Sequence, residues 1–414
     1  QRQMCIRDSA YSALKLFKLH DFGVEFSVIP GISVTFKVAG HILGSAFVEM
    51  TVKDGEETTK LIFTGDIGQP DQPIIEDPAT VAGADFIITE STYGNRLHEA
   101  YDKEGELARI VNDTVERGGN VIIPAFAVGR TQVLLYYFQK LFAEGKIPEV
   151  PIYVDSPMAS KATQITLTNP DEYDEEARAL YAMQGRRLVN MRNLRFTATV
   201  QESMAINDVP GSKIIISASG MADAGRILHH LKHNLWREDS SIVFAGYQAE
   251  GTMGRNLIEG AKRVKIMGET ISVKAKIFNM KGFSAHADKE QLLKWFSGMQ
   301  TTPKAFFVTH GELDAAMELS DTLGRTLGTA TYIPHFGDCA EIHGTQWQMH
   351  ESEIVREEPA AIELRAYMRG MEREYLQERT RIEQIVARDA TKAVAIRKKL
   401  EKLRKYMDKM LGDL

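Results

Sequence analysis

The stretch Leu61-Ile-Phe-Thr-Gly-Asp-Ile-Gly68 decides how this chain is interpreted. Its apolar first half is typical of a buried strand, and the Gly and Asp residues that follow end the strand abruptly. Asp66 is therefore expected at the carboxyl end of a strand, where the ligands of layered α/β folds collect. The stretch predicts a mixed α/β fold whose functional side chains lie at strand ends.

Four other polar residues stand in the same setting as Asp66. Any one of them alone is more typical of a hydrogen-bonded loop residue or a turn. Five in one chain favour a functional site, because imidazole and carboxylate groups on rigid elements suit metal ligation. The four are His41 in Gly40-His-Ile-Leu-Gly-Ser, Glu90 in Phe86-Ile-Ile-Thr-Glu, His286 in Gly282-Phe-Ser-Ala-His-Ala-Asp and His310 in Phe306-Phe-Val-Thr-His-Gly-Glu.

The composition is that of a globular protein without a disulfide framework. The chain has 414 residues, a formal net charge of −6 and only two cysteines, Cys5 and Cys339. The length suggests two or three domains, and the cysteine count excludes a Cys-rich zinc finger and fits a reducing cytosol. No apolar run approaches the ~18 residues of a membrane span. We therefore expect a cytoplasmic protein in which any contact with nucleic acid comes from local basic patches.

The rhythm of strands and helices changes twice along the chain. From Val28, short β-rich runs end in Gly or Asp, and residues 47–64 are an expected hairpin around Asp54-Gly55. Between about residues 98 and 263, apolar runs such as Val121-Ile-Ile-Pro alternate with helical patterns, which predicts a parallel sheet with helices on both faces. The short-strand style returns near Val273, so one domain interrupted by another accounts for the order.

These changes divide the chain into five segments. Residues 1–9 are interpreted as a non-native junction, and residues 10–97 and 273–350 as the two parts of the outer domain. Residues 98–272 are the inserted domain, and residues 351–414 a charged helical extension. We expect the extension to pack on the body or on a partner, with contact to an RNA backbone as the alternative. It could also support a homodimer.

Eight sequence blocks follow one another along the chain: Ala39-Gly-His-Ile-Leu-Gly-Ser-Ala, Phe63-Thr-Gly-Asp, Thr89-Glu-Ser-Thr-Tyr-Gly, Ile123-Pro-Ala-Phe-Ala-Val-Gly-Arg-Thr-Gln, Ser217-Ala-Ser-Gly-Met, Gly246-Tyr-Gln-Ala-Glu-Gly-Thr-Met-Gly, Phe283-Ser-Ala-His-Ala-Asp and Thr309-His-Gly-Glu. Together they closely resemble the β-CASP branch of the metallo-β-lactamase-fold hydrolases, over about residues 28 to 350. That family includes ribonuclease J and the endonuclease subunit of the eukaryotic pre-mRNA 3′-end cleavage machinery. The resemblance implies an α/β fold: an αββα metallo-β-lactamase sandwich, incomplete at its N-terminus, with an inserted β-CASP domain.

The resemblance also implies a site with two zinc ions and a general acid. By position, His41 is similar to a ligand of one zinc, His310 to a ligand of the second, and Asp66 to the carboxylate that bridges both. A metal-bridging hydroxide would be the nucleophile, His286 the general acid and Glu90 the residue that orients it. The expected contacts to phosphate are Ser284, Ser219, Gly220, Met221 and Arg130, of which Arg130 could equally support its own loop.

One family motif is missing from the sequence. The family's first metal motif, His-x-His-x-Asp-His, supplies most ligands of both zincs, but the only histidine before His41 is the isolated His20. Truncation would explain this, as would a natural homologue that has lost zinc; the five intact site residues favour truncation. Three ligands cannot close two tetrahedral sites, so we expect this chain alone to bind zinc weakly and to cleave little RNA.

The leading hypothesis is zinc-dependent hydrolysis of RNA phosphodiester bonds, with single-stranded RNA as the expected partner. The alternative is a catalytically inactive RNA-binding or scaffold subunit of an RNA-processing complex. A third hypothesis, a hydrolase of small thioesters or lactams, is disfavoured by the inserted domain. His98 is assigned to structure or surface. His229, His230 and His233 lie on one expected helix and are assigned to its surface, although the i, i+4 spacing of His229 and His233 could bind a metal.

Overall fold

The computed structural model describes residues 11–99, 102–183, 189–249, 251–280, 282–352, 382 and 393–412. The expected junction at residues 1–9 and most of the expected helical extension lie outside this set. The chain divides into two units, Gln1–Pro334 with Ala340–Gln348, and His335–Cys339 with Met349–Leu414. The second unit contains the helix α12 (Ala393–Gly412). None of the helices in the described residues combines the length and apolar character needed to cross a membrane.

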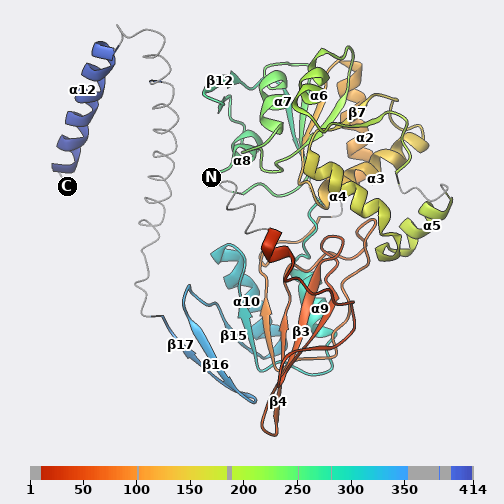
Figure 1. Cartoon of the computed structure of the whole chain (residues 1–414), viewed down its shortest axis with the longest axis vertical. Helices are drawn as coiled ribbons and strands as arrows, with labels where there is room; N and C mark the ends of the chain where they lie inside the picture. Colours follow the sequence, from red (N-terminus) through yellow and green to blue (C-terminus); the bar gives the residue numbers. More distant parts are fainter. Residues whose placement is uncertain are drawn as a thin grey trace. The chain divides into compact units, whose positions relative to one another are not determined.

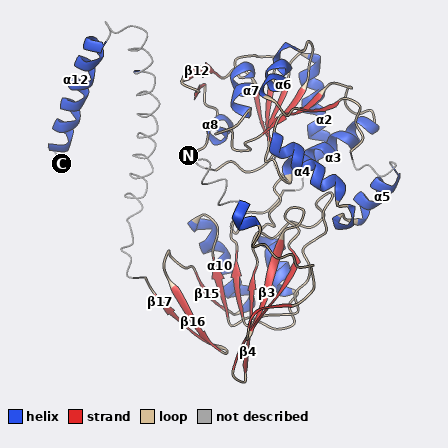
Figure 2. Cartoon of the chain, viewed as in Figure 1, coloured by secondary structure: helices blue, strands red, loops and turns tan. Residues whose placement is uncertain are grey.

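The first unit contains a seven-stranded sheet in the order β1-β2-β3-β4-β5-β14-β15 (Figures 1 and 2). The first four strands pair antiparallel, and β4, β5, β14 and β15 pair parallel. Asp54 pairs with Glu57 across the β3–β4 turn, which confirms the hairpin predicted there. The strands are β1 (Phe26–Ile29), β2 (Ile32–Val38), β3 (Ala46–Asp54), β4 (Glu57–Phe63), β5 (Phe86–Thr89), β14 (Ala305–Val308) and β15 (Ala330–Tyr332).

Two helices pack against this sheet, α9 (Lys289–Ser297) and α10 (Leu313–Leu327). Their apolar side chains form one buried core with side chains of the strands. Burial of this kind is the main force that holds the layer together, at about 25 cal/mol per Å² of apolar surface. The core contains Ile62, Ile87, Phe306 and Val308 from the strands and Leu292, Phe296, Leu319 and Leu323 from the helices.

The predicted parallel sheet is confirmed. It has six strands in the order β13-β10-β6-β9-β7-β8, and every neighbouring pair is parallel. The strands are β6 (Val121–Pro124), β7 (Ile152–Val154), β8 (Leu194–Phe196), β9 (Ile214–Ser217), β10 (Ser241–Phe244) and β13 (Lys276–Asn279). Such a sheet needs helical crossovers between its strands, which the alternation of the sequence supplies.

Helices cover both faces of the parallel sheet (Figure 2). Val121 and Ile123 belong to the core on one face, with residues of α2 (Lys103–Glu116) and α3 (Arg130–Ala143). Ile122 belongs to the core on the other face, with residues of α7 (Ile227–Asn234) and α8 (Met253–Ile258). Successive strand residues point to opposite faces, so an uninterrupted apolar run is what a doubly covered strand requires.

One boundary differs from the expectation. β13 was expected in the second part of the outer domain, which was placed from residue 273 onward. Its four residues pair in parallel with β10, from Ser241 with Lys276 to Phe244 with Asn279, so the six-stranded sheet continues through Asn279. The change of sequence style near Val273 follows the hairpin of β11 (Arg263–Ile266) and β12 (Glu269–Ser272). It does not mark the end of the six-stranded sheet.

The remaining elements belong to neither of the two large sheets. The helices are α4 (Pro157–Thr168), α5 (Glu175–Met183) and α6 (Val200–Ala205), with two short 3₁₀ turns, η1 (Pro170–Glu172) and η2 (Ile206–Asp208). There are also two two-stranded sheets in the described residues. One is the antiparallel pair β11 (Arg263–Ile266) and β12 (Glu269–Ser272), and the other consists of β16 (Cys339–His343) and β17 (Gln346–His350).

Candidate metal centre and active site

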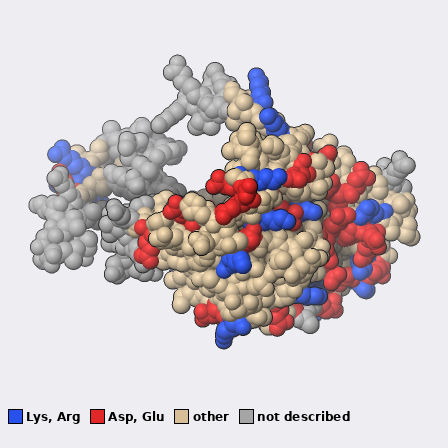
Figure 3. All heavy atoms as spheres, turned by 90° about the horizontal axis from the view of Figure 1, so that it is seen from below, with Lys and Arg blue, Asp and Glu red and all other residues tan. Residues whose placement is uncertain are grey.

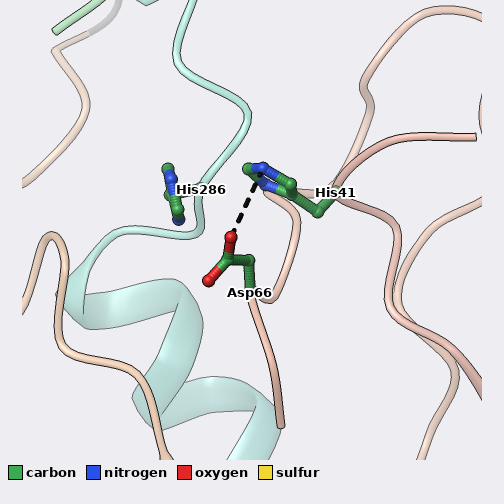
Figure 4. Close-up of side chains that lie close together, drawn as sticks. All are labelled: His41, Asp66 and His286. Carbon is green, nitrogen blue, oxygen red and sulfur yellow. Dashed lines mark ion pairs between the residues drawn. The ribbon is translucent and has the colours of Figure 1, made fainter. Parts of the chain in front are cut away.

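Three loops from different parts of the sequence meet in one cluster. His41 follows β2, Asp66 follows β4, and His286 precedes α9. One donor atom from each lies within 4.8 Å of the other two, and Figure 4 shows the three side chains together. The cluster therefore unites two histidines and a carboxylate, the donor types that zinc prefers.

The carboxylate of Asp66 reaches two histidines at once. Its Oδ2 lies 3.8 Å from Nε2 of His41, and its Oδ1 lies 3.4 Å from Nε2 of His310, which follows β14. Each of the two carboxylate oxygens thus lies near a different imidazole. This is the arrangement that a bridging carboxylate between two cations requires.

Gly68 brings the three loops together. Its N–H donates to the carbonyl of Ala39 over 2.8 Å, and it forms an isolated β-bridge with His286. A Cβ at this position would lie only 1.8 Å from the carbonyl oxygen of Gly40. The loops that carry the cluster can therefore approach each other only because residue 68 has no side chain.

Glu90 fixes the ring of His286. Its Oε2 lies 2.9 Å from Nδ1 of His286, and its Oε1 accepts from the N–H of Ile67 over 2.6 Å. The carboxylate is almost completely buried. With Nδ1 occupied in this way, Nε2 is the nitrogen of His286 left for contact with a substrate or an ion.

The two clustered histidines differ in their affinity for a proton. Burial, followed by the charge of His286, lowers the pKa of His41 below its ordinary value. Burial also opposes the charged form of His286, but the hydrogen bond and the charge of Glu90 outweigh it and raise the pKa of that ring. A neutral imidazole suits metal ligation and a protonated one suits proton donation.

A largely apolar cleft of about 490 Å³ opens beside the cluster. His41 and His286 lie on its wall with Arg130, Ser284 and the backbone of Gly220 and Met221. Ser219, an expected phosphate contact, is not among the lining residues; its Oγ accepts from the N–H of Ala224 over 3.3 Å. The structure thus brings four of the five expected phosphate contacts to the cleft.

An aromatic cluster beside His286 was not singled out from the sequence. The ring of Tyr93 lies 6.0 Å from that of His286, edge to face. The guanidinium of Arg96 lies 5.6 Å from the ring of Tyr93 and 5.2 Å from that of Tyr247, whose hydroxyl donates to Glu312. Tyr93 and Tyr247 do belong to quoted sequence blocks, but an aromatic residue alone carries no signal for a site.

His98 and His230 have defined partners. Nε2 of His98 lies 2.9 Å from the carbonyl oxygen of His286, so the His98 ring helps to hold the backbone of His286 in place. The assignment of His230 to a helix surface is wrong: the residue is 1% exposed, and its Nε2 lies 2.6 Å from Oδ2 of the buried Asp155. Asp155 directly follows a strand, the same signal that marked the other site residues.

Comparison with known proteins agrees with this architecture. A Beta-Casp domain family model matches residues 131–257, and a model described as "Zn-dependent metallo-hydrolase RNA specificity domain" matches residues 270–334. One relative is 35% identical over 316 residues, and the alignment covers 76% of this chain and 70% of the relative. The chain belongs to the β-CASP branch of the metallo-β-lactamase-fold nucleases.

That relative is ribonuclease TTHA0252 of Thermus thermophilus. Archaeal proteins named transcription termination factor FttA are also similar. The one from Methanocaldococcus jannaschii is 33% identical over 324 residues, and the one from Methanosarcina mazei is 32% identical over 321 residues. These matches cover 76% and 75% of this chain, which spans about half the length (50%) of each archaeal protein.

Proposed function

We propose that this chain contributes the active site of a zinc-dependent ribonuclease, which hydrolyses phosphodiester bonds of single-stranded RNA. The observation that carries the proposal is the carboxylate of Asp66, with one oxygen directed to His41 and the other to His310. The names of the relatives, a ribonuclease and termination factors, support RNA as the substrate class.

The donor set fits zinc by chemistry. His41, Asp66 and His310 offer two imidazole nitrogens and two carboxylate oxygens, and the lowered pKa of His41 favours the neutral ring that a metal requires. Zinc, when bound, lowers the pKa of water and polarises a phosphoryl oxygen. These three side chains supply too few donors for two tetrahedral ions, so further ligands would have to come from outside this set.

His286 would donate a proton to the leaving oxygen of the phosphodiester bond that is broken. The ring lies on the cleft wall, its Nδ1 is held by Glu90, and its Nε2 remains free to act. The raised pKa supports the same role, because a general acid must hold its proton until the bond breaks. His286 also has a donor atom within 4.8 Å of those of His41 and Asp66, but a ligand needs the opposite shift, so we assign it to proton transfer.

The polar groups of the cleft would position the strand. Ser284, Gly220 and Met221 line the same cleft as His286, and their hydroxyl and backbone N–H groups can donate to phosphate oxygens. A mostly apolar wall suits unpaired bases better than a duplex, whose bases are hidden inside the stack.

The test is cleavage of a labelled single-stranded RNA by the complete gene product that contains this chain, with zinc added. His286→Ala should cut at least about a hundred-fold more slowly, the usual size of a general-acid effect. His229→Ala, which removes an exposed histidine of α7, is the matched control and should cut normally.

Equal cleavage by the wild type and His286→Ala would remove His286 from the mechanism. No cleavage by the wild type, with RNA still bound, would favour the alternative of an inactive RNA-binding subunit. Activity on a thioester but none on RNA would favour a small-substrate hydrolase.

A further inference from the structure

Phe126 exposes its aromatic ring in the cleft, although large apolar side chains are more often buried. It follows β6, lines the cleft, and keeps 48% of its surface exposed. The ring lies against the bare backbone of Gly220, since a Cβ there would lie 3.0 to 3.1 Å from three ring carbons. One side of the ring therefore has a fixed support, and the exposed remainder is available to a ligand.

The wall around Phe126 is also apolar and open. Val128 is 44% exposed and Met158 is 66% exposed, and both line the same cleft. An exposed apolar patch beside charged catalytic groups is typical of a binding surface. A flat ring on such a wall is the kind of platform on which nucleobases stack.

Arg130, four residues after Phe126, contributes a guanidinium to this wall. Its Nη1 is buried and has no hydrogen-bond partner, and no ion pair is formed by Arg130 with any residue in the described part of the chain. The group packs 5.9 Å from the ring of Phe283 instead. Burial lowers the pKa of Arg130 to about 10, which still leaves it charged at neutral pH. A buried cation without a counterion is costly unless a ligand supplies the negative charge.

A second cationic side chain, Lys103, lies near Arg130 in a protein of net negative charge. Lys103, at the start of α2, has its pKa lowered by burial and then by the charge of Arg130. The chain as a whole carries a net charge of −6, and acidic side chains gather along one side of the face in Figure 3. A phosphate is therefore attracted by this local group and not by the overall field.

We infer that Phe126 and Arg130 form a nucleotide subsite of the cleft, in which one base of single-stranded RNA stacks on the Phe126 ring and a backbone phosphate meets the Arg130 guanidinium. The inference rests on the proposed function for the identity of the ligand. Phe126 and Arg130 would thus contribute to the affinity for RNA without belonging to the metal cluster. Because every base has a π-face, the subsite accepts any base and contributes no sequence specificity.

The experiment measures binding without cleavage. The complete gene product is titrated against a short fluorescent single-stranded RNA in the presence of a chelator, and anisotropy reports the dissociation constant. Phe126→Ala should weaken binding by about five- to a hundred-fold, the range for loss of one base–aromatic stack. Phe196→Ala is the matched control: Phe196 of β8 is 45% exposed but does not line the cleft, and its loss should leave binding unchanged.

Two further variants separate stacking from a change in the fold. Phe126→Trp should retain binding, and its fluorescence should be quenched when RNA stacks on the indole. Arg130→Gln should reduce the slope of log affinity against log salt by about 0.7, the value for one lost phosphate contact on a single strand. Arg263→Gln, at an exposed arginine of β11, is the charge control.

The outcomes distinguish the subsite from the proposed function. If the wild type binds RNA and Phe126→Ala binds it equally well, the subsite is refuted and the proposed function stands. An RNA of abasic residues should bind the wild type and Phe126→Ala alike, and a persistent difference would also refute stacking. A wild type that neither binds nor cleaves RNA would overturn both.

Discussion

Gly68→Ala is the substitution that most directly tests how the cluster is assembled. Gly68 lies two residues after Asp66, where the loop of Gly40 and His41 crosses it. Its φ lies outside the left-handed region, so alanine can adopt the same backbone conformation. The cost of the change is therefore a matter of contact and not of backbone strain.

The size of the effect follows from the distances. The new Cβ would lie 1.8 Å from the carbonyl oxygen of Gly40 and 2.7 Å from the nitrogen of His41. A carbon and an oxygen normally stay ~3.3 Å apart, so the two loops must separate by about 1.5 Å. The 2.8 Å hydrogen bond from Gly68 to Ala39 would then break, at a cost of about 1 kcal/mol. A shift of this size between reacting groups costs about a hundred-fold in rate.

The assay compares zinc affinity, RNA cleavage and thermal unfolding of Gly68→Ala with those of Gly298→Ala. Gly298 ends α9, and a Cβ there would lie an ordinary 3.4 Å from the nearest carbonyl oxygen. We expect Gly68→Ala to lose zinc affinity and activity while it still unfolds cooperatively, and Gly298→Ala to behave as the wild type. If Gly68→Ala retained normal zinc affinity and normal cleavage, the close approach of these loops would not position the site.

Two other buried carboxylates give further predictions. Asp155→Asn should lower the free energy of unfolding by about 3 kcal/mol at neutral pH, because Arg226 and His230 lose their charged partner. Burial opposes the charge of Asp155, but hydrogen bonds from His230 and its other partners hold its pKa well below the usual range. The stabilisation by Asp155 is thus present above the unfolded pKa of ~3.9 and is lost as pH falls through the folded pKa. Urea unfolding across a pH series should therefore show that the free energy of unfolding falls less steeply with acid in Asp155→Asn than in the wild type. Glu90→Gln should slow RNA cleavage by about ten- to a hundred-fold, since the amide cannot hold a charged His286 as the carboxylate does, with little effect on RNA affinity measured in chelator.

The control for Asp155→Asn is a carboxylate that is less buried. Asp239→Asn removes a half-buried partner of Arg237 and should cost less than about 1 kcal/mol. Equal losses for Asp155→Asn and Asp239→Asn would contradict the view that Arg226 and His230 depend on the buried charge of Asp155. Normal cleavage by Glu90→Gln would mean that His286 does not depend on Glu90 for its orientation.

The local sequence pattern predicted much of the architecture. The uninterrupted apolar run of Val121 predicted a doubly covered strand, and the two faces of β6 do pack against different helices. The Asp54-Gly55 turn predicted its hairpin, because turn chemistry is decided by a few adjacent residues. Asp66, Glu90 and His310 meet as expected, since β4, β5 and β14 are neighbouring parallel strands that end at the same edge of the sheet.

Other features depend on residues far apart in the sequence, and pattern alone does not reveal them. His230 and Asp155 are 75 positions apart, so the helical spacing of the histidines gave no sign that one of them is buried against a carboxylate. Phe126 and Gly220 likewise meet only through the parallel pairing of β6 with β9. The placement of β13 beside β10 is a choice of strand partner, which hydrophobic periodicity does not specify.

Zinc-dependent cleavage of single-stranded RNA by the complete gene product and by its Asp66→Asn variant shows whether Asp66 and its two histidines form a zinc site. Asparagine keeps the size of the side chain but has only one acceptor oxygen, so it cannot serve two cations. We predict that the wild type cleaves RNA only when zinc is present and that Asp66→Asn loses at least about a hundred-fold in rate. Cleavage by Asp66→Asn at the wild-type rate, or cleavage by the wild type in chelator, would contradict the assignment of a zinc-dependent site to Asp66 and its two histidines.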